Sequence, residues 1–133
     1  MAKKIDTWMI FEVLASRKGV AEKSLKEHVE KIEKEKSVDS LEKEFDEIKE
    51  VEDPHPSIKK GFSQICEIRC KVESFSELVK IVLNYGPTMI EIEGPEKIEM
   101  DMGEMQDSLN LVAEMMHKFL KAGAGGMMIS GKE

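Results

Sequence analysis

Residues 62–93 read FSQICEIRCKVESFSELVKIVLNYGPTMIEIE, and this segment specifies the predicted fold. From Cys66 to Val72 apolar and charged residues alternate strictly, which is typical of a strand with one buried face. Ser74 and Glu77 resemble a capping box at the start of a helix, and Gly86 suits the end of that helix. A second short strand, rich in Ile and Glu, follows. The order strand, helix, strand predicts a right-handed βαβ unit.

The residues before this segment are predicted to form a similar unit. Residues 7–15 are almost entirely apolar, which favours a central strand covered on both faces, with a short helix as the alternative. Residues 21–36 place apolar side chains at helical spacing on one side and Lys and Glu elsewhere, which predicts a helix. Residues 38–51 fit either a helix or a charged edge strand. We predict the edge strand, because it makes the two halves equivalent.

The remaining segments are a loop, a third helix and a tail. Two prolines within residues 53–60 predict a loop. Asp101 and Glu104 predict the start of a long amphipathic helix that ends near Ala122. Its apolar residues recur at spacings of four and three: Met105, Leu109, Val112, Met116 and Phe119. Residues 123–133 are predicted to be a Gly- and Met-rich tail of a single α+β domain that covers residues 1–133.

Two βαβ halves in one sheet predict a ferredoxin-like split βαβ sandwich (βαββαβ), of the α+β class, with an additional C-terminal helix. The first and third strands would be central, and Met9, Phe11 and Val13 would face the helices. The other face would then carry exposed apolar residues, which a soluble monomer avoids. Either the third helix or a second subunit would cover it. We predict a homo-oligomer, most simply a two-fold dimer, with an interface that includes Trp8, Ile10, Leu14, Glu67 and Arg69.

Composition narrows the class of protein. The chain has 133 residues and a net charge of -7, which argues against a nucleic-acid partner. No apolar run is long enough to span a membrane, and the N-terminus lacks a signal-peptide core, so we expect a cytoplasmic protein without a membrane partner. Charged residues make up 35% of the chain and are mostly Lys and Glu, a composition typical of thermophilic proteins.

The two cysteines are predicted to be core residues. On a strand, Cys66 and Cys70 point the same way and lie about 13 Å apart. A disulfide needs Cα atoms within about 7 Å, so these thiols cannot bridge each other. They could bind a metal only together with residues from elsewhere in the chain. We therefore predict neither a metal site nor a cofactor at this pair.

A small-ligand pocket is one interpretation of three polar residues near the central unit: Gln64, Asn84 and Tyr85. The alternative is that Asn84 and Tyr85 hold the end of the helix. No catalytic motif is present, and we predict no catalytic residue. An enzyme or metal site could still assemble from scattered histidines and carboxylates, of which the candidates are His28, His117, Glu12 and Glu67.

Three motifs carry a resemblance to a known family: Ser63-Gln64-Ile65-Cys66, Asn84-Tyr85-Gly86-Pro87 and Ala122-Gly123-Ala124-Gly125-Gly126. In these the chain resembles a family of small conserved archaeal proteins of unknown function. The resemblance covers most of the chain. It implies an archaeal, cytoplasmic origin and brings with it no activity and no catalytic residue.

The leading functional hypothesis is a non-catalytic oligomeric module. It would bind a small ligand or a protein partner at the open sheet face or at the subunit interface. The alternative is an enzyme or metal-binding protein whose site is assembled from the scattered His and carboxylate residues. A thiol redox role ranks third, because it requires accessible thiols with a lowered pKa.

Overall fold

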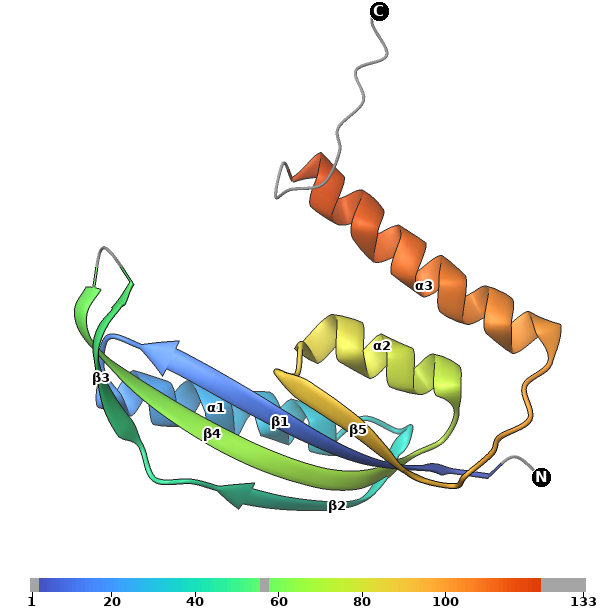
Figure 1. Ribbon diagram of the computed structural model, residues 1–133, viewed down its shortest axis with the longest axis horizontal. Coiled ribbons are helices and arrows are strands. Elements are labelled where there is room, and N and C mark those ends of the chain that lie inside the picture. The colour runs from blue at the N-terminus through green and yellow to red at the C-terminus, as the bar shows by residue number, and fades with distance from the viewer. Residues whose placement is uncertain (1–2, 56–57, 123–133) are drawn as a thin grey trace, which may run out of the picture.

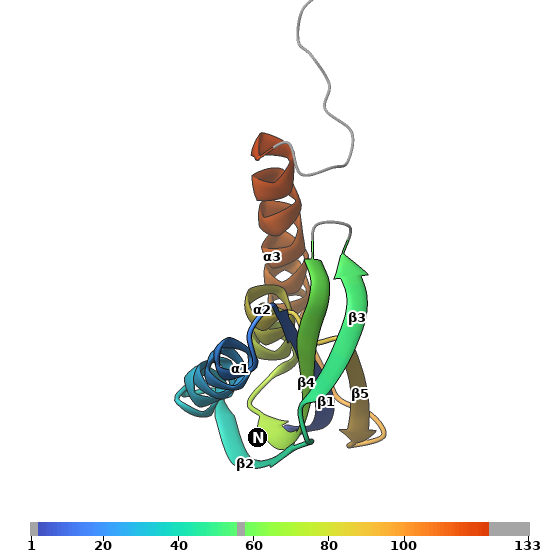
Figure 2. The same cartoon turned by 90° about the vertical axis from the view of Figure 1, so that its left-hand side faces the viewer.

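The computed structural model describes residues 3–55 and 58–122, which form a mixed α+β fold with an antiparallel sheet (Figure 1). The elements in chain order are β1 (Ile5–Ala15), α1 (Lys18–Glu33), β2 (Val38–Phe45), β3 (Lys49–His55), β4 (Ile58–Val72), α2 (Phe75–Tyr85), β5 (Met89–Gly94) and α3 (Met102–Lys121). Helices α1 and α2 cover one face of the sheet, and α3 lies beyond α2 and extends away from the sheet (Figures 1 and 2). The α+β class is therefore confirmed.

The centre of the sheet is the antiparallel pair of β1 and β4. The two strands pair without a break from Ile5 opposite Val72 to Ala15 opposite Phe62. β5 pairs with the outer side of β1, and β2 pairs with the outer side of β4. Both central strands thus have neighbours on each side, so β1 is a central strand as predicted for residues 7–15. Among the described residues, helices cover only one of its faces, so the predicted cover on both faces is wrong.

The core lies between this central pair and the two covering helices. Met9, Phe11, Cys66 and Ile68 are all buried on the helix side of the sheet, and Val13 packs against the same cluster. The predicted assignment of alternate residues to the two faces is confirmed. Burial of a large apolar side chain such as Met9, Phe11 or Ile68 contributes roughly 1.5–3 kcal/mol to stability.

The edge beside β4 differs from the prediction. The predicted loop over residues 53–60 is wrong for residues 53–55 and 58–60, because β3 continues to His55 and β4 already begins at Ile58. Residues 56–57 of the prediction lie outside the described residues. β4 has 15 residues, enough to pair with β2 along its second half and with β3 along its first half. An edge strand tolerates proline, since one of its sides needs no backbone N–H for pairing. With five strands, the four-strand ferredoxin-like sheet is not confirmed in the predicted form.

The helices begin and end close to the predicted residues. The Ser74 Oγ accepts a hydrogen bond from the Glu77 backbone N–H at 3.3 Å, which caps α2. Gly86 ends α2 with φ 58° and ψ 60°, the left-handed conformation expected there. α1 starts earlier than predicted, at Lys18, and buries Leu25 and other residues of its predicted apolar stripe.

We expect Gly86→Ala to lower the free energy of unfolding by about 1 kcal/mol, because a Cβ atom disfavours the left-handed conformation. Gly19→Ala is the matched control, since an added Cβ there meets no atom within 4 Å and the backbone is helical. The control should keep the stability or raise it by up to about 1 kcal/mol. Urea unfolding followed by circular dichroism measures both changes, and equal losses in the two variants would contradict the assignment.

Candidate functional site

The sheet face without helices carries the residues that the sequence predicted for an interface. Trp8 and Ile10 are partly buried there, and Leu14 is 47% exposed. The register places Trp8 opposite Arg69 and Ile10 opposite Glu67, so these residues share one face as predicted. α3 packs against α2 and does not cover this face, which we call the open face.

Hydrogen bonds and ion pairs organise the open face. The Trp8 indole N–H donates to the Glu67 Oε1 at 3.0 Å, which holds the ring against the sheet. Two ion pairs join neighbouring strands: Arg69 Nε to Glu93 Oε1 at 3.2 Å, and Lys71 Nζ to Asp6 Oδ1 at 2.7 Å. Both pairs are well exposed to solvent, so each contributes no more than about 1 kcal/mol to stability.

Carboxylates outnumber cations on the open face. The pairing registers place acidic residues from four strands there: Asp6, Glu12, Asp39, Glu42, Glu44, Glu67, Glu91 and Glu93. Glu44 and Glu67 lie directly opposite each other on neighbouring strands. The cations on this face include Lys4, Lys49, Arg69 and Lys71, of which Lys4, Arg69 and Lys71 each bind one of these carboxylates. The face therefore presents a net negative surface.

The three residues of the predicted ligand pocket have different hydrogen-bonding partners. The Gln64 Nε2 donates to the backbone oxygen of Asp46 at 3.0 Å, next to the edge strand β2. Asn84 is exposed, and the Tyr85 hydroxyl donates to the Glu35 Oε2 just beyond the end of α1. Burial, together with this hydrogen bond, raises the pKa of Tyr85 to about 12. The arrangement of Asn84 and Tyr85 at the end of α2 fits the structural alternative, and the ligand role stays a prediction.

The histidine and carboxylate candidates also lie on separate elements. The His28 ring lies between Phe11 and Tyr85, with centroid distances of 5.4 Å to each ring. Its Nε2 donates to the Tyr85 backbone oxygen at 2.7 Å, because a carbonyl oxygen can only accept. Glu12 accepts from the Ser63 hydroxyl at 2.9 Å on the open face. Within residues 3–55 and 58–122, no group of three or more His, Cys, Asp or Glu side chains could hold a metal ion.

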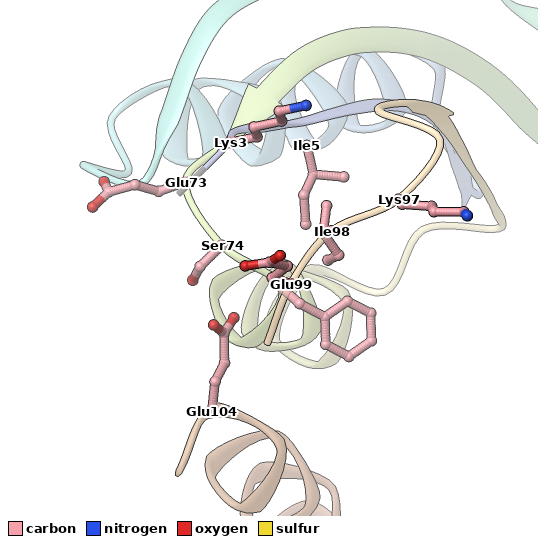
Figure 3. Close-up of a pocket in the computed structure, with 9 residues that line it drawn as sticks. Lys3, Ile5, Glu73, Ser74, Lys97, Ile98, Glu99 and Glu104 are labelled. Carbon is pink, nitrogen blue, oxygen red and sulfur yellow. The ribbon is translucent and has the colours of Figure 1, made fainter. Parts of the chain in front are cut away.

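A cavity of about 690 Å³ lies where α3 joins the rest of the protein (Figure 3). Its lining combines acidic residues such as Glu73 and Glu99 with Lys3 and Lys97, so neither sign of charge dominates strongly. The Glu104 Oε2 accepts the backbone N–H of Ser76 at 3.1 Å and so ties the first turn of α3 to the first turn of α2. The cavity therefore lies at the junction between α3 and the rest of the protein, which we call the body.

The apolar stripe of α3 is the largest feature that the sequence did not place correctly. The predicted stripe and the preceding Met102 are all exposed, with Met102 at 84%, Leu109 at 66% and Met116 at 51%. The side of α3 that turns toward the body is a different one, formed by Glu104, Ser108, Leu111 and Met115, which are buried or partly buried. The apolar stripe of the helix thus faces solvent.

The exposed residues of α3 follow a heptad pattern. They are spaced alternately by three and four residues, which is the a and d pattern of a helix that packs against another helix. We call this set the α3 seam: Met102, Met105, Leu109, Val112, Met116 and Phe119. Within the part of the chain that the structure describes, the seam is an exposed apolar surface.

Among the helices of the described residues, none combines the length and the apolar character that crossing a membrane requires.

Comparison with protein families identifies the family of the chain. A family model, described as the MJ0538 family, matches residues 6–129, and the chain therefore belongs to the MJ0538 family, which is uncharacterised. The predicted resemblance to a family of unknown function is confirmed. Comparison with curated proteins gives no match, and comparison with solved structures gives none.

We expect Cys66 and Cys70 to resist a thiol reagent in the native protein at about pH 8, because both are buried and the thiolate is the reactive form. Burial raises the pKa of each thiol from 9.0 to about 11. Titration of the thiols with and without denaturant measures their access. Rapid native labelling would contradict burial and revive the redox hypothesis.

The raised pKa values of Cys66 and Cys70 make the stability of the protein depend on pH. Between about pH 9 and pH 11 the folded protein retains thiol protons that the unfolded chain loses. This contribution to stability is complete below pH 9 and decreases as the pH rises through 11. We expect the pH-dependent decrease to be smaller in a variant with both Cys66→Ala and Cys70→Ala, as measured by urea unfolding at each pH.

Proposed function

We propose that this member of the MJ0538 family is a non-catalytic, homo-oligomeric module that binds a protein partner. The observation that carries the proposal is the exposed α3 seam. Soluble monomers rarely expose contiguous apolar patches of more than a few hundred Å². A helix whose a and d residues all face water gains the most from burial against a second helix, and a second copy of the chain always offers one.

The open face supports a different role from the seam. Two open faces brought together by a two-fold axis would place carboxylates opposite carboxylates, which is unfavourable. Self-association through the seam avoids this repulsion and leaves the open face free. We propose that the open face binds a partner with a basic surface, with Trp8 as the aromatic contact and the carboxylates around it as the source of selectivity.

We also propose that the fold is a variant of the ferredoxin-like arrangement. β2 and β3 both pair with β4 on the side away from β1, so together they occupy one edge position. If they are counted as a single divided strand, the order of the sheet supports a ferredoxin-like split βαβ arrangement with a lengthened edge. The buried free thiols support a reducing, cytoplasmic compartment, and the Lys- and Glu-rich composition supports a thermophilic origin.

We expect native mass spectrometry and light scattering to give a dimer for the wild-type protein. Leu109→Glu places a charge in the middle of the seam and should raise the dimer dissociation constant by at least about 30-fold, the effect of losing one strong interface contact. Asn110→Glu adds the same carboxylate one residue later on the polar side of α3 and is the matched control. A wild-type protein that stays monomeric at all accessible concentrations would refute the proposal.

Trp8 is the only tryptophan of the chain and therefore reports on the open face alone. We expect acrylamide to quench Trp8 fluorescence equally in the dimeric wild type and in monomeric Leu109→Glu, because the seam lies on the helix side of the molecule. If quenching increases when the dimer dissociates, the subunits meet at the open face. That result would instead favour the interface predicted around Trp8, Ile10 and Leu14.

A further inference from the structure

We infer that two copies of the chain associate by antiparallel pairing of their α3 helices along the seam. This inference rests on the proposed function and specifies which surfaces meet and in which direction. Antiparallel pairing about a two-fold axis places Leu109 of one copy opposite Val112 of the other. It also places Met105 opposite Met116 of the second copy. The two interfaces are then identical, as a closed dimer requires.

The flanks of the seam favour a second copy as the occupant. On the side of the seam away from α2 lie Gln106, Ala113 and Leu120, which carry no charge, and Ala113 allows close approach near the middle. The charged side chains Glu114 and Lys118 lie on the polar side, where their oxygen and nitrogen atoms are 3.8 Å apart. Two seams can therefore meet without burying an unpaired charge.

The charges at the ends of α3 determine the direction. The first turns carry Asp101, Glu104 and Asp107, and the last turns carry Lys118 and Lys121. In an antiparallel pair each acidic end lies beside the basic end of the second copy, and the helix dipoles also oppose each other favourably. A parallel pair would bring like charges together at both ends.

The position of the body on α3 supports the same direction. The Ser76 to Glu104 hydrogen bond joins the first turns of α2 and α3, and α2 packs along α3 on the side that carries Ser108 and Leu111 (Figure 1). Each chain carries a net charge of -7. Antiparallel pairing places the two Ser76 to Glu104 junctions at opposite ends of the helix pair, whereas parallel pairing would place them side by side.

The apolar segment Met127-Met128-Ile129 of the same chain is too short to replace the second copy. This segment spans at most about 10 Å when extended. The seam runs from Met102 to Phe119, about 25 Å along the helix axis. The segment could cover less than half of the seam, so most of the exposed apolar surface would remain.

Cysteine cross-linking distinguishes the two directions. Met105→Cys and Met116→Cys proteins, one of them carrying an affinity tag, are treated with a short bifunctional thiol reagent separately and after mixing. In an antiparallel dimer the two Met105→Cys residues are about 16 Å apart along the axis, so the mixed sample should cross-link and the separate samples should not. The wild-type protein is the control for Cys66 and Cys70, and it should give no cross-link.

The outcomes separate this inference from the proposed function. Cross-links in each separate sample would show a parallel pair and would overturn the antiparallel inference, while the dimer itself would stand. A dimer without cross-links in any sample would show that the seam is not the interface and would overturn the inference as well. A monomeric wild type would refute the proposed function and this inference together.

Discussion

The unbroken antiparallel pairing of β1 with β4 is the constraint on which the rest of the structure depends. It aligns the alternation of the two strands, so that Met9 and Ile68 turn to the helices while Trp8 and Arg69 turn to the open face. A shift of one residue would exchange these faces and expose the core. Both helices that cover the sheet, and through α2 the attachment of α3, require this register.

Much of the fold was predictable because its signals are local. The capping box at Ser74 and the glycine at position 86 fix the ends of α2 whatever surrounds them. The course of residues 53–60 could not be predicted in the same way, because prolines have the same local effect in a loop and in an edge strand. Only the length of β4, which offers β3 a partner, decides between the two.

The candidate surfaces were predictable to different degrees. Period-two alternation places Trp8 and Glu67 on one face, so the open face could be read from the sequence, although their hydrogen bond could not. The apolar residues of α3 were visible as well, but periodicity does not reveal what covers a stripe. α3 packs against the body through residues that include Ser108 and Leu111. Because this side of the helix is partly polar, its apolar pattern in the sequence is weaker than that of the seam.

The α3 seam and the open face differ in charge, and this difference determines which kind of partner would fit each surface. The seam is neutral along its length, so a second copy can bury it without leaving a charge in the interface. The open face has carboxylates from four strands, so pairing of two identical open faces would place carboxylates opposite carboxylates. Since pairing through α3 leaves the open face uncovered in each subunit, a dimer would present two acidic sites to a basic partner. Binding at both sites would then benefit from a raised effective concentration.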